Sequence, residues 1–371
     1  MTVIFVALSA WLLFLLQKYL YLKYWDKDIK VTISFDKEEV TEGEENALLE
    51  IIENRKWMPL ATLKVKFQCS RHLQFRGGKG SVVTDRYYRS DFFSVMPYQR
   101  ITRTLKMNCP KRGYYDIHGI DLVAADLFFS QEMHAHYDAG DAFYVYPKPF
   151  GVKFLEHALQ KINGEIAVKR HVVEDPFSFR GIREYETFDE MKSINWKATA
   201  RTGDLKVNMK EYTSVKSVRV FLNLADNNIL RREELLEMSI SICATLIKHM
   251  LDNGIRTSLY ANATDAISGQ ILAMENNTGR GNLIGVLRAL SRLNLEKTEN
   301  FEETFGEKLL ERNDKYTIII SPERHEDFQR LLLKQKDKDN FCFICPVKEM
   351  EEERILPELR ANCSMILEEQ G

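Results

Sequence analysis

Residues 217 to 347 alternate between short apolar runs and longer amphipathic segments. The runs SVRVFLNL, IRTSLYANA, KYTIIIS and FCFICPV are rich in residue types that favour strands. The segments between them, such as RREELLEMSISICATLIKHMLDNG, repeat apolar residues at the spacing of an amphipathic helix. Strands that alternate with helices favour a mostly parallel sheet covered on both faces. We therefore expect a doubly wound α/β domain, which binds its ligands at the carboxyl ends of its strands.

These strand ends carry none of the common catalytic motifs. The chain has no G-x-x-x-x-G-K-[ST] phosphate loop and no G-x-S-x-G nucleophile elbow. The Gly279-Arg280-Gly281 stretch does not follow an expected strand, so we interpret it as a turn. We expect a protein that is not an enzyme and has no cofactor.

Residues 30 to 147 have the character of an all-β module. Short runs such as VTISF, ALLEIIEN, LKVKFQC and AFYVYP are separated by turn-formers such as TEGEEN. This spacing favours a β-sandwich. The stretch HAHYDAG, residues 134 to 140, holds an H-x-H pair with Asp138 nearby. A zinc site needs three or four convergent ligands, and we therefore expect a solvated loop there.

The first 25 residues predict a membrane-spanning helix. The apolar run from Val3 to Leu16 covers only about 21 Å as a helix, so the helix must continue to about Leu22 to cross a hydrocarbon core of about 30 Å. The tyrosines and tryptophan that follow are typical of a membrane interface. The stretch lacks the basic start and the cleavage site of a signal peptide. A signal peptide and a peripheral helix remain the two alternatives to a membrane-spanning helix.

The charge distribution predicts the orientation of this helix. Lys18, Lys23, Lys27 and Lys30 follow the apolar run and no basic residue precedes it, so the large domains should be cytoplasmic, below a single pass through the plasma membrane. The six scattered cysteines agree with a reducing compartment. A net charge of -2 argues against a nucleic-acid binder.

Cys342 and Cys345 form a C-x-x-C inside the apolar run FCFICPV. A redox pair would lie at the N-terminus of a helix, where the thiolate is stabilised. In a strand the two side chains would point to opposite faces, so we expect ordinary buried thiols.

The stretch REYETFDEMKSINWKATARTGDLKV, residues 183 to 207, is here named the signature segment. It resembles the signature of the bacterial family called domain of unknown function 58, which runs R-x-Y-x-x-G-D, then R-x-I-D-W, then S-A-R, then L-x-V. Tyr115 in KRGYYDIHGIDLVAADLFF and the stretch VYPKP at 145 to 149 also resemble parts of that family. Residues of the signature segment that we single out as an interaction site are Arg183, Tyr185, Asp189, Asn195, Trp196, Lys197 and Arg201.

The resemblance implies an architecture and a set of partners. It implies a membrane anchor at 1–25, a β-sandwich domain at 30–150, a connector with the signature at 151–214 and a von Willebrand factor A-like α/β domain at 215–371. Members of the family are associated with MoxR-type AAA+ ATPases, often with a transglutaminase-like membrane protein nearby, in the assembly or activation of envelope proteins. The resemblance therefore implies an adaptor bound to such an ATPase.

The chain departs from the family at several positions. Within the signature segment, Asn195 stands where the family has aspartate. A von Willebrand A domain that binds metal uses D-x-S-x-S after its first strand, where this chain has Asn223, Ala225 and Asn227, with Asp226 one position out of phase. A hard divalent cation prefers anionic oxygen ligands. We therefore expect no metal, although a metal-dependent binding or hydrolytic domain and a nucleic-acid binder remain the alternative functions.

Two interpretations of the signature segment remain open. In one it is a joint, in which Arg183 and Arg201 pair with neighbouring carboxylates and Trp196 buries a large apolar face. In the other it is a surface that a partner protein recognises, because tryptophan and arginine are common energetic anchors of interfaces. Catalysis is disfavoured, since no histidine or cysteine lies between 172 and 242.

Overall fold

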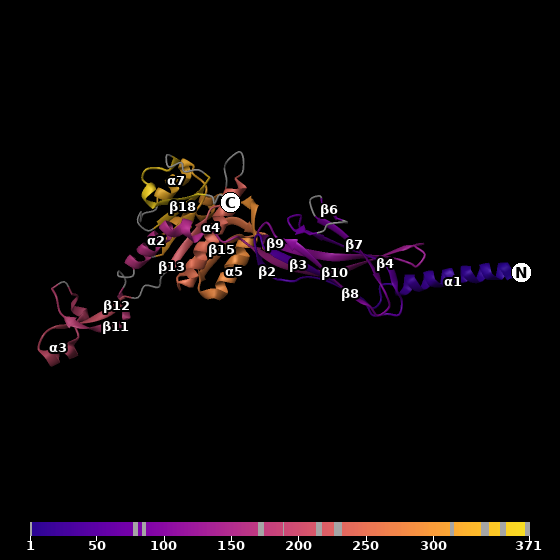
Figure 1. The fold of residues 1–371 in the computed structure, drawn as a ribbon. Coiled ribbons are helices and arrows are strands. Elements are labelled where there is room, and N and C mark those ends of the chain that lie inside the picture. The colour runs from indigo at the N-terminus through magenta and orange to yellow at the C-terminus, as the bar shows by residue number, and fades with distance from the viewer. Residues whose placement is uncertain are drawn as a thin grey trace. The chain divides into compact units, whose positions relative to one another are not determined.

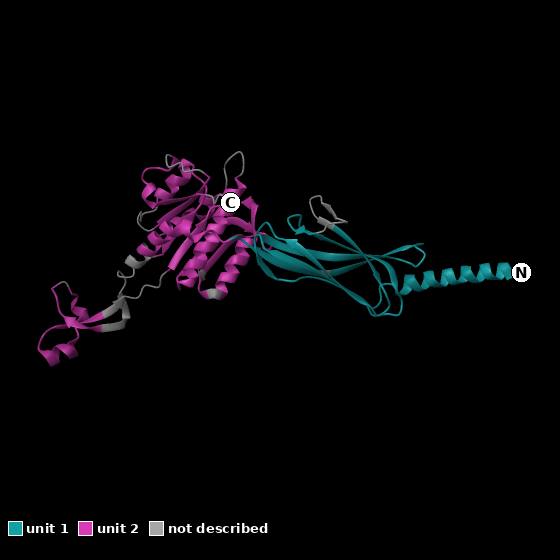
Figure 2. Ribbon diagram, viewed as in Figure 1, with its two compact units in different colours: residues 1–148 teal, residues 149–371 magenta. Residues whose placement is uncertain are grey.

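The computed structural model divides the chain into two compact units, residues 1–148 and residues 149–371 (Figure 2). The residues that the structure describes are 2–76, 81–83, 87–169, 174–187, 189–212, 217–225, 232–311, 315–334, 341–348 and 354–367. An N-terminal apolar helix and a β-rich domain form the first unit, and an α/β region forms most of the second (Figure 1). These three features confirm the predicted order of fold classes.

Helix α1 (Thr2–Tyr24) is 23 residues long, with a mean hydropathy of 1.9, which makes it long and apolar enough to cross a membrane. Its last turns pack against the β-rich domain. Tyr21 and the following Trp25 are buried in the core of the β-rich domain, and the Tyr21 hydroxyl donates to the Pro59 carbonyl at 2.7 Å. The C-terminal part of α1 is therefore docked on the domain rather than tethered to it.

Lys56 donates hydrogen bonds to backbone carbonyls at and just after the C-terminal end of α1. Its buried ammonium group donates to the carbonyls of Tyr24 and Lys27, each at 2.9 Å, and to that of Trp25. These carbonyls have no partner inside the helix, and the negative end of the helix dipole attracts a cation. Burial nevertheless lowers the pKa of Lys56 to about 8.

Two sheets form the β-rich domain. One has the order β1-β3-β8-β5 and the other has the order β2-β10-β9-β4-β7-β6. The core between them contains side chains of both, for example Ile52 and Phe143. The strands are β1 (Ile29–Phe35), β2 (Glu39–Thr41), β3 (Glu45–Asn54), β4 (Leu60–Cys69), β5 (Gln74–Phe75), β6 (Ser81–Val83), β7 (Tyr87–Val95), β8 (Arg100–Asn108), β9 (Gly113–Ala125) and β10 (Glu132–Tyr146).

The stretch 134–140 lies within β10, so the predicted loop is wrong. It pairs with β9 through a bulge between Tyr137 and Gly140, and the long pairing on both sides of the bulge keeps the segment extended. The His136 ring is exposed and lies 2.7 Å from Asp121 and 3.3 Å from Asp138. Among the described residues, no group of three or more histidines, cysteines or carboxylates is arranged to hold a metal ion.

A buried charge cluster joins the two sheets of this unit. Glu50 on β3 is opposite Arg103 on β8, and Arg103 reaches Asp91 on β7 of the other sheet at 2.8 Å. Arg89 pairs with the same Asp91. Loss of solvent and the nearby Asp91 carboxylate raise the pKa of Glu50 to about 8. Glu50 therefore keeps its proton at neutral pH in the folded protein.

We expect this carboxyl group to make the first unit less stable as pH rises from about 4.5 to about 8. Over that range the unfolded chain has lost the Glu50 proton while the folded chain retains it, so raising the pH favours unfolding. The Glu50→Gln variant should show a flatter decline in thermal melts at several pH values. The control variant Glu38→Gln changes an exposed carboxyl group and should show the same decline in melting temperature with pH as the parent. If Glu50→Gln also declines as steeply as the parent, Glu50 is not the group responsible.

The second unit is built on a seven-stranded sheet with the order β15-β14-β13-β17-β18-β19, in which β16 also pairs with β14. The pairs from β14 through β13, β17 and β18 to β19 are parallel, whereas β15 and β16 are antiparallel to β14. The strands are β13 (Ser217–Leu222), β14 (Arg256–Asp265), β15 (Ile271–Asn277), β16 (Leu293–Thr298), β17 (Tyr316–Ile320), β18 (Phe341–Val347) and β19 (Cys363–Leu367).

Helices cover both faces of this sheet (Figure 1). One core holds Val220 with helices α2 (Val152–Lys169), α4 (Glu233–Asp252) and α5 (Gly279–Ser291), and the other holds Phe221 with α6 (Phe301–Leu310) and α7 (Glu326–Leu333). The five continuously buried residues of β17 reflect this cover. Helix α2 was assigned from sequence to a connector, but Leu155 and Ile162 place it in the first of these cores.

The C-x-x-C motif lies in β18, as predicted. Cys342 belongs to the core on one face and Cys345 to the core on the other, so strand alternation separates the two thiols. Burial raises the pKa of Cys342 to about 11 and that of Cys345 to about 12. Both are therefore protonated, unreactive core residues at neutral pH.

Candidate functional site

The signature segment folds as a small hairpin module. Strands β11 (Glu174–Glu184) and β12 (Lys206–Tyr212) pair antiparallel as a separate two-stranded sheet. Between them lie a short 3-10 helix, Met191–Ser193, and helix α3 (Trp196–Thr202). The sequence predicted an extended connector, whereas this segment has its own secondary structure.

An ion pair closes the turn after β11. Arg183 donates to Asp189 through both terminal nitrogens, at 2.6 and 2.5 Å, and Asp189 also accepts the Glu186 amide at 2.8 Å. The Arg183 guanidinium and this amide lower the pKa of Asp189. Tyr185 is half-buried, and its amide donates to the Leu205 carbonyl at 2.9 Å. The predicted pairing of Arg183 with a neighbouring carboxylate is confirmed.

Asn195 determines where α3 begins. Its side chain accepts the Ala198 amide at 2.9 Å and donates to Asn208 on β12 at 2.6 Å. An asparagine is as good an N-cap as the aspartate of the resembled family, so this departure preserves the local structure. Gly203 ends the helix in a left-handed conformation, with φ of 84°, that favours glycine. Caps at both ends thus define a helix of only seven residues.

The predicted burial of Trp196 is wrong. Its side chain is 64% exposed, because it is the first residue of α3 and the cap leaves it outside the hairpin. Lys197 and Arg201 on the same helix are also exposed. Among the side chains of the module that the structure describes, the large apolar ones that are exposed are Ile182, Met191, Trp196 and Leu205.

We expect Trp196→Ala to leave stability within about 0.5 kcal/mol of the parent, because an exposed side chain is removed without a cavity. Asp189→Ala should act differently: it removes the partner of Arg183 and the acceptor of the Glu186 amide. Thermal melts and limited proteolysis of the hairpin measure both effects. A large loss of stability in Trp196→Ala would restore the joint interpretation.

A second candidate site lies at the carboxyl ends of the parallel strands. Asn223, just after β13, is fully buried and uses all of its hydrogen-bonding capacity. Its amide nitrogen donates to Ser321 at 3.0 Å and to Glu323 at 2.9 Å, and its oxygen accepts from Asn262 at 2.9 Å and from the Ala225 amide at 3.0 Å. These residues follow or belong to β13, β14 and β17, so the network ties three strand ends together.

This network does not fit a divalent cation. The Asn223 oxygen points at two N–H groups, and its amide nitrogen occupies the Glu323 carboxylate oxygen that a cation would need. Ala225 contributes a methyl group. The other two candidate positions, Asp226 and Asn227, lie outside the described residues.

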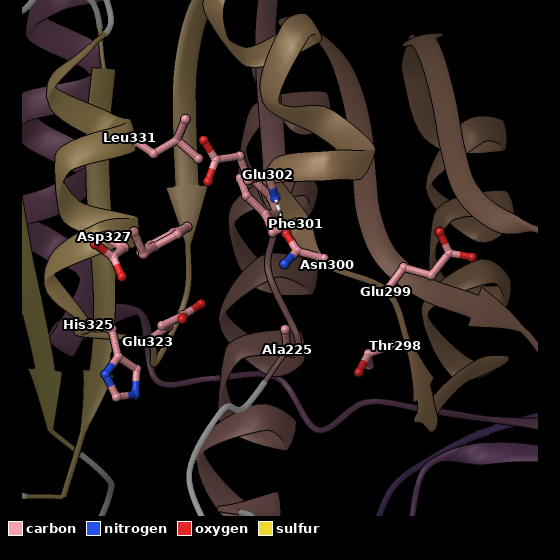
Figure 3. Close-up of a pocket in the computed structure, with 11 residues that line it drawn as sticks. Ala225, Thr298, Glu299, Asn300, Phe301, Glu302, Glu323, His325, Asp327 and Leu331 are labelled. Atoms are coloured by element: carbon pink, nitrogen blue, oxygen red, sulfur yellow. Dashed lines mark hydrogen bonds between the residues drawn. The ribbon is translucent and has the colours of Figure 1, made fainter.

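A pocket of about 550 Å³ opens above the network. Figure 3 shows carboxylates at its rim, from Glu302, Glu323 and Asp327, with the His325 ring beside them. The Asn300 side chain accepts the Glu302 amide at 2.9 Å and so begins α6 at this edge. The pocket lies at the strand ends where the α/β pattern predicted it, and its acidic lining favours a basic ligand over an anion.

We expect calorimetric titration with magnesium, manganese or calcium to give no saturable binding at micromolar concentrations. Asn223→Asp should lower the melting temperature, because it places a carboxylate against Glu323, and the added cations should partly restore it. The control is Asn253→Asp at the exposed end of α4. Micromolar affinity in the parent that Asp226→Ala abolishes would show a site rebuilt one residue along.

Sequence reasoning missed three members of this network: Asn262, Ser321 and Glu323. Asn262 interrupts the run LYANA, and Ser321 and Glu323 follow the run YTIII; polar residues inside or just after an apolar run are the signal that could have identified them. A buried polar residue at a strand end needs a partner, and parallel neighbours supply one.

Comparison with protein families gives one match. The model of the family described as "Protein of unknown function DUF58" matches residues 181–357, which include the signature segment and most of the α/β region. The match supports the resemblance to that family seen in the signature segment. No curated protein matches the chain.

Solved structures resemble the chain only weakly. A CARDB domain from Pyrococcus furiosus is 14% identical over 32% of this chain and 93% of its own length, with a TM-score of 0.20. A non-cellulosomal cohesin from Archaeoglobus fulgidus is 12% identical over 35% of this chain and 97% of its own, with a TM-score of 0.22. A cohesin from a Clostridium thermocellum cohesin–dockerin complex is 11% identical over 32% and 99%, with a TM-score of 0.24.

Proposed function

We propose that this chain is a membrane-anchored, non-enzymatic interaction protein whose second unit binds another protein through the hairpin module. The observation that carries the proposal is the exposed Trp196 on a helix capped by Asn195 and Gly203. A large aromatic side chain held on a preformed helix loses little conformational entropy on binding, and tryptophan is a common binding hot spot. The hydrogen bonds at the two ends of α3 fix the helix that carries this exposed side chain.

The surroundings of Trp196 favour an acidic partner surface. Exposed apolar side chains of Met191 and Leu205 belong to the same module, and Lys197 and Arg201 lie on the same helix. Apolar contacts would supply affinity, while the two cations would select complementary charge and speed association. The same residues could engage nucleic acid, but the chain as a whole has a net charge of -2.

The proposed partner is a MoxR-type AAA+ ATPase, and the proposed further member of the assembly is a transglutaminase-like membrane protein. This assignment comes from the family resemblance, which is supported by the match over residues 181–357. The proposed process is the assembly or activation of envelope proteins. We place both units on the cytoplasmic side of the plasma membrane, because Lys23, Lys27 and Lys30 follow the apolar run of α1.

The α/β region offers a second contact surface. We propose that it is a von Willebrand A-like domain without the metal; its parallel sheet and the pocket at the carboxyl ends of the strands support this assignment. A basic side chain of the partner would complement the acidic rim formed by Glu302 and Asp327. Because the side chain of Asn223 is fully used in hydrogen bonds to described residues, binding there should not depend on divalent ions bound by this chain.

Binding of the full chain, reconstituted in vesicles, to a MoxR-type ATPase from the same organism tests the proposal. We expect Trp196→Ala to weaken binding about 30-fold or more, the effect of losing a hot spot worth about 2 kcal/mol. Asp327→Lys tests the pocket independently, and Glu38→Lys on the β-rich domain is the control. In the ADP-bound or nucleotide-free state, where the ATPase needs no magnesium, chelators should leave binding unchanged.

The outcomes distinguish the two surfaces. Loss of binding in Asp327→Lys alone would move the contact from the hairpin to the pocket. The absence of association at tens of micromolar, with and without nucleotide, would overturn the partner assignment. If all three variants bind the ATPase with the affinity of the parent chain, neither the hairpin module nor the pocket is the contact surface.

A further inference from the structure

The loop between β9 and β10 exposes three consecutive apolar side chains beside helix α1. Leu127, Phe128 and Phe129 are 45%, 64% and 67% exposed. The ring of Phe128 lies 5.7 Å from that of Phe14, which is ten residues before the end of α1. Ten helical residues span about 15 Å, so the loop runs well back along the helix instead of stopping at its base.

Hydrogen bonds hold the loop in this position. The Gln17 side chain on α1 donates to Asp126 at 2.9 Å, and Asp126 also accepts the Ser130 amide and hydroxyl, each at 2.6 Å. Gln17 is the first residue after the apolar run Val3–Leu16, and this contact satisfies its side-chain amide nitrogen. Asp126 is itself only 1% exposed, so the polar atoms are directed inward and the aromatic rings outward.

The backbone of the loop is largely self-satisfied. The amide of Asp126 donates to the Gln131 carbonyl, that of Phe129 to the Asp126 carbonyl, and those of Ser130 and Gln131 to the Asp126 side chain. Four N–H groups of a six-residue turn are thus bonded within it. An apolar environment requires such internal bonding, because an unpaired backbone group costs several kcal/mol there.

The length and apolar character of α1 indicate that the exposed loop 126–131 contacts lipid. Residues 2 to 13 are all exposed, whereas contacts with the domain begin at Phe14. A helix needs about 20 residues to span the hydrocarbon core of a bilayer, and the span found among the described residues of this chain is α1 itself, with 23 residues. If the segment Thr2–Tyr24 is what crosses the membrane, its docked part enters the lipid as well, and the loop that lies along that part enters with it.

Other loops at the same end of the unit fit the boundary of the bilayer. Trp57, Met96 and Tyr98 are exposed in the connections β3–β4 and β7–β8. The Tyr98 amide donates to the Lys56 carbonyl at 3.2 Å, and Lys56 holds the carbonyls at the end of α1. These side chains therefore lie level with the end of the helix. Tryptophan and tyrosine prefer the headgroup layer, which is where that end would be.

We propose that the loop 126–131 inserts into the acyl region of the membrane alongside α1, so that the first unit holds the bilayer by two elements. The inference rests on the proposed function, in which α1 enters the membrane. The ligand is a lipid surface, with Leu127, Phe128 and Phe129 in contact with acyl chains and Trp57 and Tyr98 at the headgroups.

An environment-sensitive dye on single introduced cysteines tests this directly. The full chain, with the half-exposed Cys363 replaced by alanine, is labelled at Phe128→Cys, Leu8→Cys or Glu38→Cys and reconstituted into phosphatidylcholine–phosphatidylglycerol vesicles. The other five native cysteines are buried. Brominated lipids then report contact with acyl chains. Position 8 reports on α1, and position 38, at the opposite end of the unit, is the aqueous control.

We expect a blue-shifted emission and quenching by brominated lipid at positions 8 and 128, and neither at position 38. Quenching at 8 with a water-like signal at 128 would overturn the loop insertion and leave the anchor intact. A shielded but unquenched dye at 128 would also overturn it, because protein would then cover the loop. If neither 8 nor 128 is quenched, the membrane anchor of the proposed function fails as well.

Discussion

The saturated side chain of Asn223 holds together the carboxyl ends of three strands of the α/β region. Its two donors and two acceptor positions are satisfied by Ser321, Glu323, Asn262 and the Ala225 amide. A buried network is stabilising when every member is partnered and costly when one is not. The strand ends are therefore held by two amide side chains, a hydroxyl and a carboxylate that are bonded to one another, and the acidic pocket opens above them.

The chain exposes aromatic side chains in two different settings. In the hairpin module Trp196 is presented by a short capped helix with cations on the same helix. In the loop 126–131 the exposed rings surround inward-pointing polar groups, and no lysine or arginine lies in the loop. The first combination suits a charged protein surface and the second suits lipid. Exposed apolar area alone would not distinguish these partners, whereas the nearby charges do.

The sequence predicted elements wherever one periodicity dominates. β18 and α4 were identified because continuous apolar runs and three-to-four spacing are strong local signals. Helix α2 was missed as part of the core, since its role depends on distant partners such as Val218. Trp196 was assigned to burial from its residue type, but the cap at Asn195 decides its direction. The Asn223 network depends on the order of strands in the sheet, and local pattern does not encode that order.

The Lys56 contacts have a mechanical consequence. Because one ammonium group binds the last carbonyl of α1 and carbonyls just after it, while Tyr21 and Trp25 are packed in the domain core, the helix and the β-rich domain share a stiff joint. A flexible tether would let the domain swing freely above a bilayer. A stiff joint instead transmits torque: rotation or tilt of the helix in its surroundings turns the attached domain by the same angle.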